Sequence, residues 1–543
     1  MNTANFERWL ARRTTRRLAL SGALIGLSLP GLPTRTFAQT ATPEQTPVNL
    51  LTKPSAQFGA YPFQLGVASG DPLPNSVILW TRLAPSPLSG GGMDPLPYDV
   101  RWELSTDDHF GIIVQSGIAV ADPNLAHSVH VDVTGLEPGR EYFYRFMVGS
   151  EVSQTGRTKT APAMGQAVDA IRFGFASCAN YEHGYFTAYR AMAAERLDLI
   201  VHLGDYIYEY QDGANNVRVP EERRVATGWE ADALREYRDR FALYRTDADL
   251  RAAHESAPWV VTWDDHEVAD NYAGDHDSGN APVDAFLARR ADAYQAYYEH
   301  MPLRPSSLPV GPDMTLFRHL SFGDLLHFYV LDTRQYRDPR PSGDGVRPRT
   351  PASLDPDVSM LGKEQERWLQ QKLAESGAIW NTLAQQNFMA ETYVPVAEGE
   401  AQTWYNDSWT GYPVARDRML AQIREQQVSN PVVLTGDIHT AWANDLKADW
   451  ENLASATIAT EYVSTSISAG GATPSTSLQP YKDHFDYVKY FDGRHGGYII
   501  AEVSADTWRS DYYVVDDLND PASGVSMAAT YVTEAGNPGA QPG

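Results

Sequence analysis

The chain has 543 residues, of which 43% are hydrophobic and 21% are charged, and its formal net charge at pH 7 is −25. Single hydrophobic cores stop growing at about 250–300 residues, so we expect one large domain and one small one. The acidic charge argues against nucleic acid as a binding partner, because phosphate backbones are bound by Lys and Arg.

The first 38 residues are predicted to be a signal peptide. Paired arginines at 12–13 and 16–17 precede an apolar stretch at 18–32, and TFA at 36–38 offers a cleavage site. The run 15–20 (TRRLAL) resembles a twin-arginine signal, and an ordinary secretory signal rich in arginine is the alternative. We therefore expect export by the twin-arginine machinery to the periplasm or the extracellular space. No later segment is apolar over the roughly 20 residues of a membrane span, so we expect no transmembrane helix in the mature chain.

Residues 39–56 are rich in Thr, Pro and Gln and are predicted to be a flexible leader. Residues 57–162 are predicted to be a small all-β domain, because short β-branched and aromatic runs alternate there with Gly, Pro and Asp clusters. This pattern is typical of immunoglobulin-like and fibronectin-like β-sandwiches, with Tyr142 in the position of their corner tyrosine. The expected strands are Ser76–Arg82, Asp99–Leu104, Ile112–Ala121, Val129–Val133 and Tyr142–Val148.

Strands and helices alternate between residues 168 and 533, which predicts a layered α/β catalytic domain. Strands are expected at 171–176, 197–203, 259–263, 325–331, 382–389, 432–435 and 498–503. Helices are expected at 185–195, 232–254, 284–300, 362–375 and 414–427. The last residues, 534–543, are rich in Gly and Pro and are predicted to be a disordered tail.

Potential metal ligands directly follow the apolar strands of this domain. They are Cys178, then Asp205 and Tyr208, then Asp264, Asp265, His266 and Glu267, then Asp437 and His439. Ligands of open α/β folds bind at the carboxyl ends of the strands, so we expect these side chains to share one site. Carboxylates favour hard cations such as Ca²⁺, Mg²⁺ or Mn²⁺, whereas thiolate, phenolate and imidazole favour iron or another transition metal. A mixed metal centre is therefore expected.

Each of these residues also has a structural interpretation. Cys178 is the only cysteine, so the chain has no internal disulfide, and a free cysteine is often a small buried hydrophobe. Asp205 could cap a turn, and Tyr208 could be a packed aromatic residue. His266 and His439 could be satisfied core histidines. Their joint occurrence at strand ends favours the metal interpretation.

The motifs, in this order, resemble the metallophosphatase superfamily, and their details resemble the PhoD-type alkaline phosphatase family. The matching blocks are FASC at 175–178, GDYIYEY at 204–210, WDDHE at 263–267, LDTR at 331–334, NDSWTGYP at 406–413 and GDIH at 436–439. The resemblance extends over essentially the whole mature chain and includes the β domain and the leader. It implies a four-layer α/β/β/α sandwich preceded by the small all-β domain.

The resemblance also implies a ligand set. Fe³⁺ would be held by Cys178, Asp205, Tyr208 and His439, and Ca²⁺ by Asp205, Asp265 and Asp437, with Asp205 bridging the two ions. The family's later histidine is not evident, and Gln386 is expected in its place. Asp264 and Asp332 are spare carboxylates that could bind a further Ca²⁺, and other divalent metals would also suit these ligands.

The expected function is an exported, metal-dependent alkaline phosphatase that hydrolyses phosphomonoesters and also accepts diesters. A metal-bound hydroxide would attack the phosphorus while both cations draw charge from the phosphoryl oxygens. His266 is expected to act as general acid or transition-state donor, and Glu267 to orient it. Arg334 is expected either to contact phosphate or to form a surface salt bridge.

Two other functions compete with this one. A phospholipase D or phosphodiesterase acting on phospholipid headgroups would use the same site and differ only in the loops at 211–230, 338–356 and 470–490. A non-catalytic cell-surface binding protein would use the immunoglobulin-like domain. The second is disfavoured, because such a protein has no need for ligands at every strand end.

Overall fold

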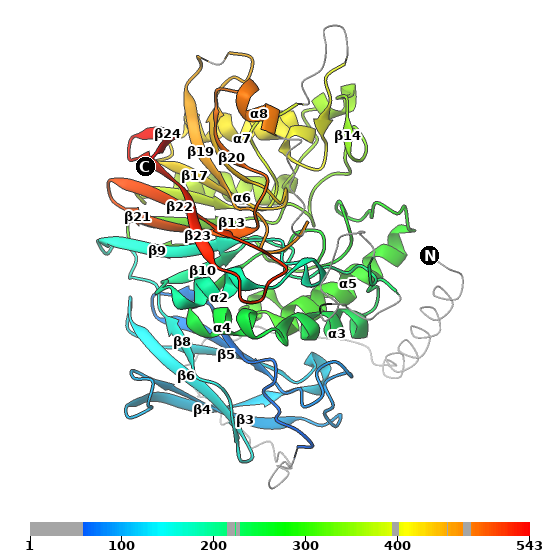
Figure 1. The fold of residues 1–543 in the computed structure, drawn as a ribbon, viewed down its shortest axis with the longest axis vertical. Helices are drawn as coiled ribbons and strands as arrows, with labels where there is room; N and C mark the ends of the chain where they lie inside the picture. Colours follow the sequence, from blue (N-terminus) through cyan, green and yellow to red (C-terminus); the bar gives the residue numbers. More distant parts are fainter. Residues whose placement is uncertain (1–57, 214–222, 224–228, 394–400, 453, 471–478) are drawn as a thin grey trace, which may run out of the picture. The chain divides into compact units, whose positions relative to one another are not determined.

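The computed structural model describes residues 58–213, 223, 229–393, 401–452, 454–470 and 479–543. The predicted signal peptide (1–38) and leader (39–56) lie outside these residues. The described chain has an all-β N-terminal region followed by mixed sheets and helices, and is therefore an α/β protein (Figure 1). None of the helices in this described part is both long and apolar enough to cross a membrane.

The first large sheet has the strand order β24-β23-β22-β21-β9-β10-β11-β1-β2-β5. Its central strands β9, β10 and β11 are parallel, and β1 continues the sheet beside β11 through the pair Gly70↔Trp259. The N-terminal region and the α/β region thus share one sheet. The bounds are β1 (Val67–Leu73), β2 (Ser76–Arg82), β5 (Ser128–Thr134), β9 (Ala170–Ala176), β10 (Leu199–His202), β11 (Trp259–Val261), β21 (Gly497–Ser504), β22 (Thr507–Val515), β23 (Val525–Glu534) and β24 (Asn537–Pro542).

The second large sheet has the order β12-β13-β15-β17-β19-β18-β20, and its strands β13, β15, β17 and β19 are parallel. Its carboxyl ends therefore also gather at one edge. The bounds are β12 (Arg318–Phe322), β13 (Leu326–Val330), β15 (Trp380–Ala384), β17 (Pro431–Thr435), β18 (Ala441–Lys447), β19 (Thr457–Val463) and β20 (Val488–Asp492). A small ladder pairs β14 (Val346–Arg347) with β16 (Trp404–Tyr405).

An apolar core joins the facing sides of the two sheets. Phe173 of β9 makes edge-to-face contacts with Phe328 of β13 and Trp508 of β22, with ring centroids 5.2 and 5.6 Å apart. Neighbouring residues such as Ile200 and Val201 belong to different cores, because successive side chains of a strand point to opposite faces.

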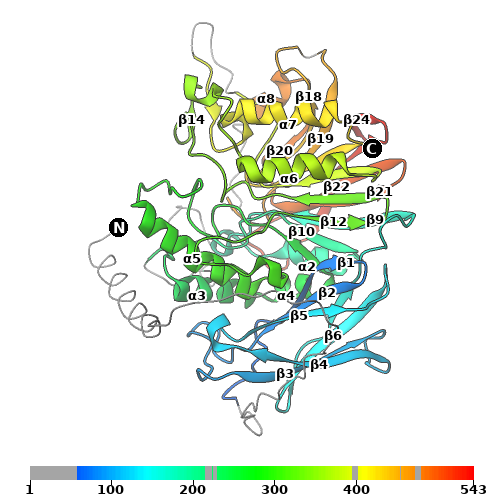
Figure 2. The same cartoon turned by 180° about the vertical axis from the view of Figure 1, so that it is seen from behind.

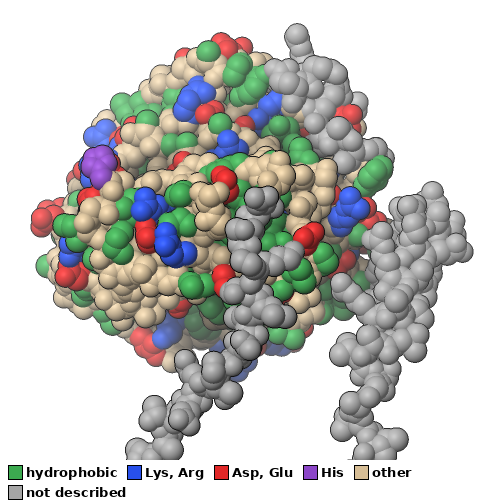
Figure 3. All heavy atoms as spheres, turned by 90° about the horizontal axis from the view of Figure 1, so that it is seen from below, with side chains coloured by type: hydrophobic (Ala, Val, Ile, Leu, Met, Phe, Trp, Pro, Cys, Tyr) green, Lys and Arg blue, Asp and Glu red, His purple; other side chains and the backbone are tan. Residues whose placement is uncertain are grey.

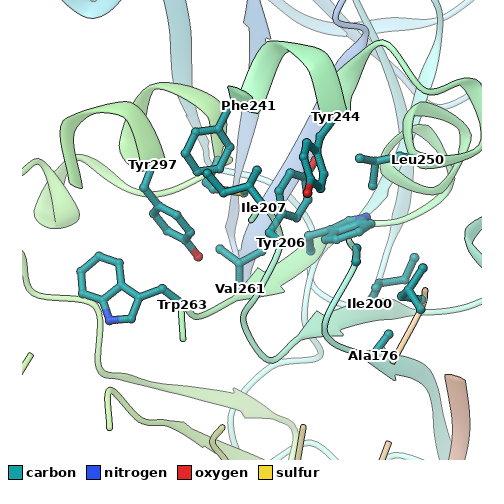
Figure 4. Packing of buried hydrophobic residues seen from close by; sticks show 14 of the residues in the cluster. Ala176, Ile200, Tyr206, Ile207, Phe241, Tyr244, Leu250, Val261, Trp263 and Tyr297 are labelled. Carbon is teal, nitrogen blue, oxygen red and sulfur yellow. The ribbon is translucent and has the colours of Figure 1, made fainter. Parts of the chain in front are cut away.

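Helices cover the other face of each sheet (Figure 2). On the first sheet, Ile200 and Val261 pack with Phe241 of α3 and Leu250 of α4 in the core drawn in Figure 4. The helices of this core are α2 (Thr187–Ala194), α3 (Leu234–Arg245), α4 (Ala248–Ser256) and α5 (Val283–His300). The second sheet is covered by α6 (Gly362–Ala374) and α7 (Pro413–Glu425), and α8 (Gln479–His484) precedes β20.

In the N-terminal region, a five-stranded sheet packs against β1, β2 and β5 through one apolar core. Its strands are β3 (Tyr98–Ser105), β4 (Ile113–Ala121), β6 (Glu141–Val148), β7 (Glu151–Val152) and β8 (Gly156–Lys159). The hydroxyl of Tyr142 accepts a hydrogen bond of 3.0 Å from the backbone N–H of Glu137, as a corner tyrosine does. Figure 3 shows one face of the protein, on which acidic and basic side chains are interspersed with apolar ones.

Two predicted elements are wrong. The helix expected at 232–254 is broken into α3 and α4, because the side chain of Asp247 accepts hydrogen bonds from Asp249 N and Leu250 N and caps a new helix. The tail expected to be disordered at 534–543 forms β24, which pairs with β23. Gly539 N and Ala540 N donate further hydrogen bonds of 2.9 Å to Thr460 Oγ1 and Asp445 Oδ1, so Gly and Pro content alone misled the prediction.

Candidate metal centre

The predicted ligands lie just beyond the carboxyl ends of parallel strands. Cys178 follows β9, Asp205 follows β10 and Asp265 follows β11 in the first sheet, whereas Asp437 and His439 follow β17 in the second. An isolated bridge between Ser177 and Ser466 joins the ends of the two sheets. The topology therefore brings five strand-end residues from both sheets to one place.

The backbone is unusual at four of these ligands. Cys178, Asp205, Asp437 and His439 have φ values of 61°, 53°, 67° and 55°, in the left-handed region that side chains other than glycine rarely occupy. Such conformations persist only where the surroundings impose them, and they gather at functional sites. Close approach adds to the constraint, since a Cβ on Gly436 would lie 2.5 Å from Ser177 Oγ.

Among the described residues, three groups of side chains could each hold a metal ion. They are Cys178 with Asp205 and His439, Asp205 with Asp265 and His266, and Asp264 with Asp265 and Asp437, with the donor atoms of each group within 4.8 Å of one another. Asp205 belongs to two groups and Asp265 to two, so the groups form one continuous cluster. The Tyr208 hydroxyl joins it, 3.0 Å from Asp205 Oδ2 and 3.1 Å from His439 Nε2.

The soft and aromatic donors gather at one end of the cluster. Burial raises the pKa of Cys178 and of Tyr208 well above their ordinary values, and nearby Asp205 adds to both. Burial lowers the pKa of His439 to about 3. The imidazole is thus neutral and ready to bind, whereas the thiol and phenol need a cation to lose their protons.

Carboxylates gather at the other end. Burial raises the pKa of Asp205 well above its ordinary value and that of Asp437 to about 7, and Asp265 adds to both shifts. Crowded, buried carboxylates repel one another unless a cation lies among them. Two buried acceptors, Asp264 Oδ2 and Asn387 Oδ1, have no hydrogen-bond donor in the described part of the chain. These donors fit hard cations.

Arg334 is fully buried, so the surface salt bridge expected for it is wrong. Its guanidinium donates to Asp264 Oδ1 and, over 2.7 Å, to Asp407 Oδ2, and its Nη2 lies 3.3 Å from Asp265 Oδ1. Burial alone would raise the pKa of Asp265, but Arg334 and His266 outweigh it and hold that pKa low. The Arg334 side chain is therefore an internal cation beside the group formed by Asp264, Asp265 and Asp437.

Two of the predicted additional ligands already use their side-chain oxygens in other hydrogen bonds. Gln386 accepts hydrogen bonds from Thr333 and donates to Thr262 Oγ1 and Leu331 O, which uses its whole amide. Asp332 accepts from Arg334 N and Gln335 N at 3.0 and 2.9 Å and so anchors its own turn.

The neighbour of Gln386 fits the ligand position better. Asn387 Nδ2 donates to Asp437 Oδ2 over 3.0 Å, which leaves its unpartnered Oδ1 beside the carboxylates. The sequence pointed to Gln386 and not to Asn387, because only the structure shows which amide is already satisfied by hydrogen bonds.

Glu267 does not orient His266. Its carboxylate accepts hydrogen bonds from the backbone N–H groups of Asp205, Tyr206 and Asp264, at 3.1, 2.6 and 2.9 Å. The partner of His266 is Glu209, whose Oε2 lies 2.8 Å from Nδ1. Glu209 lies in the GDYIYEY motif, and its position after the predicted ligand Tyr208 was the only sequence signal.

His266 presents its second nitrogen to the cluster. Nε2 lies 3.9 Å from Asp265 Oδ2 and 4.0 Å from Asp270 Oδ1, and the ring packs on Tyr208 with centroids 4.2 Å apart. Burial lowers the pKa of His266, but Asp265, Glu209 and Asp205 outweigh burial and raise that pKa well above its ordinary value. The side chain can therefore hold a proton that it could donate.

Comparisons with known proteins agree on one family. The family model described as PhoD-like phosphatase matches residues 173–512, and the model of the PhoD-like phosphatase N-terminal domain matches residues 49–162. The chain is 48% identical over 482 residues to alkaline phosphatase D of Bacillus subtilis (strain 168), covering 88% of this chain and 81% of that protein. A solved structure titled as that of PhoD is similar with a TM-score of 0.86 and 47% identity, over 90% of this chain and 93% of that one.

Proposed function

Because the chain belongs to the PhoD-like phosphatase family, it is a phosphoesterase hydrolase, and we propose that it is a metal-dependent alkaline phosphatase. The observation that carries the metal dependence is the continuous cluster of buried donors at the strand ends. The two sheets with their outer helices would be the four-layer α/β/β/α sandwich of the metallophosphatases. The paired arginines at 12–13 and 16–17 support export by the twin-arginine machinery, which fractionation of producing cells would test.

The donor chemistry assigns residues to two kinds of ion. Cys178, Asp205, Tyr208 and His439 would hold Fe³⁺, because thiolate, phenolate and imidazole suit a transition metal. Asp205, Asp265 and Asp437 would hold Ca²⁺, with Asn387 Oδ1 completing the oxygen ligands. Bound together, the cations would supply an activated water and neutralise the charge of the phosphoryl oxygens.

The protein's own residues would complete the reaction. His266 Nε2, the ring nitrogen that faces the carboxylates of the cluster, would donate a proton or hydrogen bond to the ester oxygen as it leaves. Glu209 holds Nδ1 and so fixes which nitrogen faces the substrate. Arg334 would keep Asp265 ionised and hold Asp264 in place rather than contact the phosphate, because its guanidinium is fully buried among carboxylates.

A parallel assay tests the proposal. We expect the purified protein to hydrolyse p-nitrophenyl phosphate, with weaker hydrolysis of bis-p-nitrophenyl phosphate. Chelation of Ca²⁺ should abolish both activities, and added Ca²⁺ should restore them. Elemental analysis should find iron and calcium in the active protein. Full activity after complete removal of metals would contradict the proposal.

The same assay separates the competing functions. Faster hydrolysis of phosphatidylcholine than of either p-nitrophenyl ester would favour the phospholipase or phosphodiesterase at the same site. No hydrolysis of any ester by the fully metallated protein would favour a binding protein. Only the loops that line the site would distinguish the two enzymes, since the metal ligands serve both.

Replacing Glu209 by glutamine tests the role of His266. We expect kcat to fall about 10–100-fold with little change in KM or metal content, because the partner that orients His266 is weakened. A general acid works only while protonated, so activity falls as pH rises through its pKa. Glu209 raises the pKa of His266, so the alkaline limb of the pH–kcat profile should move to lower pH in Glu209→Gln.

Glu267→Gln is the matched control, because Glu267 is another fully buried carboxylate one residue from His266. The Glu267 carboxylate accepts hydrogen bonds from backbone N–H groups of the loops that carry the candidate ligands. In Glu267→Gln, the side-chain amide nitrogen would face one of these donors. We expect that variant to lose thermal stability and metal affinity while its alkaline limb stays in place. A shifted limb in Glu267→Gln and none in Glu209→Gln would overturn the assignment.

A further inference from the structure

Arg245, the last residue of α3, is a fully buried cation. Its exposure is 0%, and Nε, Nη1 and Nη2 all lack an acceptor among the described residues. The guanidinium lies over the ring of Trp80, 4.3 Å from its centroid. A cation–π contact of this kind leaves the in-plane N–H groups unsatisfied.

Other buried arginines of the protein donate hydrogen bonds to carboxylates. Arg334 and Arg337 both donate to Asp407, over 2.7 and 2.5 Å, and Arg416 donates to Glu391 over 2.5 Å. A buried charge without such a partner is strongly destabilising. The Tyr206 hydroxyl lies near the guanidinium, and Arg245 opposes the rise in the pKa of the partly buried Glu255, but neither side chain accepts a hydrogen bond from the guanidinium nitrogens in the described chain.

Three more buried polar groups lack partners in the described part, and two of them, Tyr144 and His254, lie close enough to Arg245 for its charge to act on them. They are Tyr144 Oη on β6, Ser69 Oγ on β1 and His254 Nδ1 on α4. Ala242, one turn before Arg245, packs with Ala68 and Trp80, which places the end of α3 against β1 and β2. Burial raises the pKa of Tyr144 and Arg245 opposes the rise, which places the phenol close to the guanidinium.

The chemistry of these groups favours an anion over water. The guanidinium only donates, and both hydroxyls can donate. His254 Nε2 lies 2.9 Å from the hydroxyl of Tyr206; when that hydroxyl donates to Nε2, the proton of the imidazole resides on Nδ1. A water molecule among such donors would find few acceptors for its own protons, whereas an anion accepts from all of them and balances the charge.

We propose that Arg245 binds a small monovalent anion of the size of chloride, together with Tyr144, Ser69 and His254. The single charge of the guanidinium sets the charge of the anion, and Trp80, on which the guanidinium lies, belongs to an apolar cluster with Leu65 and Ala68. The anion would join β1 and β6 of the N-terminal region to α3 and α4, which makes it a structural site separate from the metal centre.

Thermal unfolding of the full-length, metal-loaded protein in chloride and in gluconate, at equal ionic strength, tests the site. We expect Tm to rise saturably with chloride by about 2 °C or more, because an anion that binds only the folded state stabilises it. Bromide should substitute for chloride and give an anomalous scattering peak beside the Arg245 guanidinium in crystals. Equal Tm in the two salts, or no peak at Arg245, would overturn the proposal.

Arg245→Met keeps the apolar stem and removes the donors, so its Tm should no longer respond to chloride. Arg82→Met is the matched control: Arg82 is also buried, but it donates to Ala126 O over 2.9 Å and lies 2.7 Å from His300 Nε2. That variant should lose stability and keep the full response to chloride. A response that survives in Arg245→Met would place the anion elsewhere. The bromide peak in the wild-type protein decides the matter if Arg245→Met does not fold.

Discussion

Replacing Asp205 by asparagine should lower phosphatase activity by about 1,000-fold or more, because one carboxylate serves two of the candidate metal positions. Elemental analysis of the variant should show that iron and calcium are lost together. The metal-free variant should be at least as stable as the metal-free wild-type protein. Burial and neighbouring carboxylates raise the pKa of Asp205, so a neutral amide removes an unfavourable charge. Loss of activity would then not be a consequence of unfolding.

Asp332→Asn is the matched control. Asp332 is another fully buried aspartate just beyond a parallel strand, but its oxygens accept hydrogen bonds from Arg334 N, Gln335 N and Gln335 Nε2. The asparagine should reduce stability by about 1 kcal/mol and leave the metal content unchanged. Retention of both metals by Asp205→Asn would contradict a shared ligand. Loss of metal from Asp332→Asn alone would restore the role first expected for that residue.

Arg334→Met should destabilise the metal-free protein by about 3–5 kcal/mol, because it leaves Asp264 and Asp265 buried without their cation. Denaturant unfolding with and without Ca²⁺ measures the effect. Added Ca²⁺ should stabilise the variant more than it stabilises the wild-type protein, since an external cation then replaces an internal one. Lysine should rescue little, because a point charge cannot donate to several carboxylates as the guanidinium fork does.

The control for this prediction is Arg418→Met. Arg418 pairs with Glu366 over 2.8 Å, with side-chain exposures of 29% and 24%, so its loss should change stability by no more than about 1 kcal/mol. Its response to Ca²⁺ should equal that of the wild-type protein. If Arg334→Met were as stable as Arg418→Met in the absence of metal, the buried arginine would not be the counter-charge of the cluster.

Much of the site could be predicted because its residues follow strands that are easy to recognise. Cys178, Asp205 and Asp437 each follow a short apolar run, and parallel strands must bring their carboxyl ends to one edge. The motif blocks in turn indicated the family that the chain resembles. Both inferences are local: they need the type of a residue and its position relative to one strand.

The failures concern partners that are distant in the sequence. Glu209 and His266 are 57 residues apart, and Arg334 meets Asp407 across 73 residues. Neither pair has a spacing that sequence reasoning could use. Sequence reasoning could not choose between Gln386 and Asn387 for a related reason, since the hydrogen bonds of Gln386 with Thr333 and Thr262 are formed with residues distant in the sequence. The helix break at Asp247 has a local cause, because the capping aspartate is visible in the sequence. The prediction of one helix over 232–254 gave more weight to the apolar periodicity than to this residue.

The strand β1 has a consequence for how this protein can be divided. It gives β11 its hydrogen-bonded neighbour, and from the adjoining strands Trp80 donates to Glu299 O over 3.0 Å while His130 stacks on Tyr298. Removing the first hundred or so described residues would leave one side of β11 without its hydrogen-bonded neighbour. That exposed strand is adjacent to β10, which Asp205 follows. The two family models match the N-terminal and the catalytic segments separately. Because β1 extends the catalytic sheet, the N-terminal segment could not easily have been replaced in evolution by an unrelated domain without rebuilding this part of the sheet.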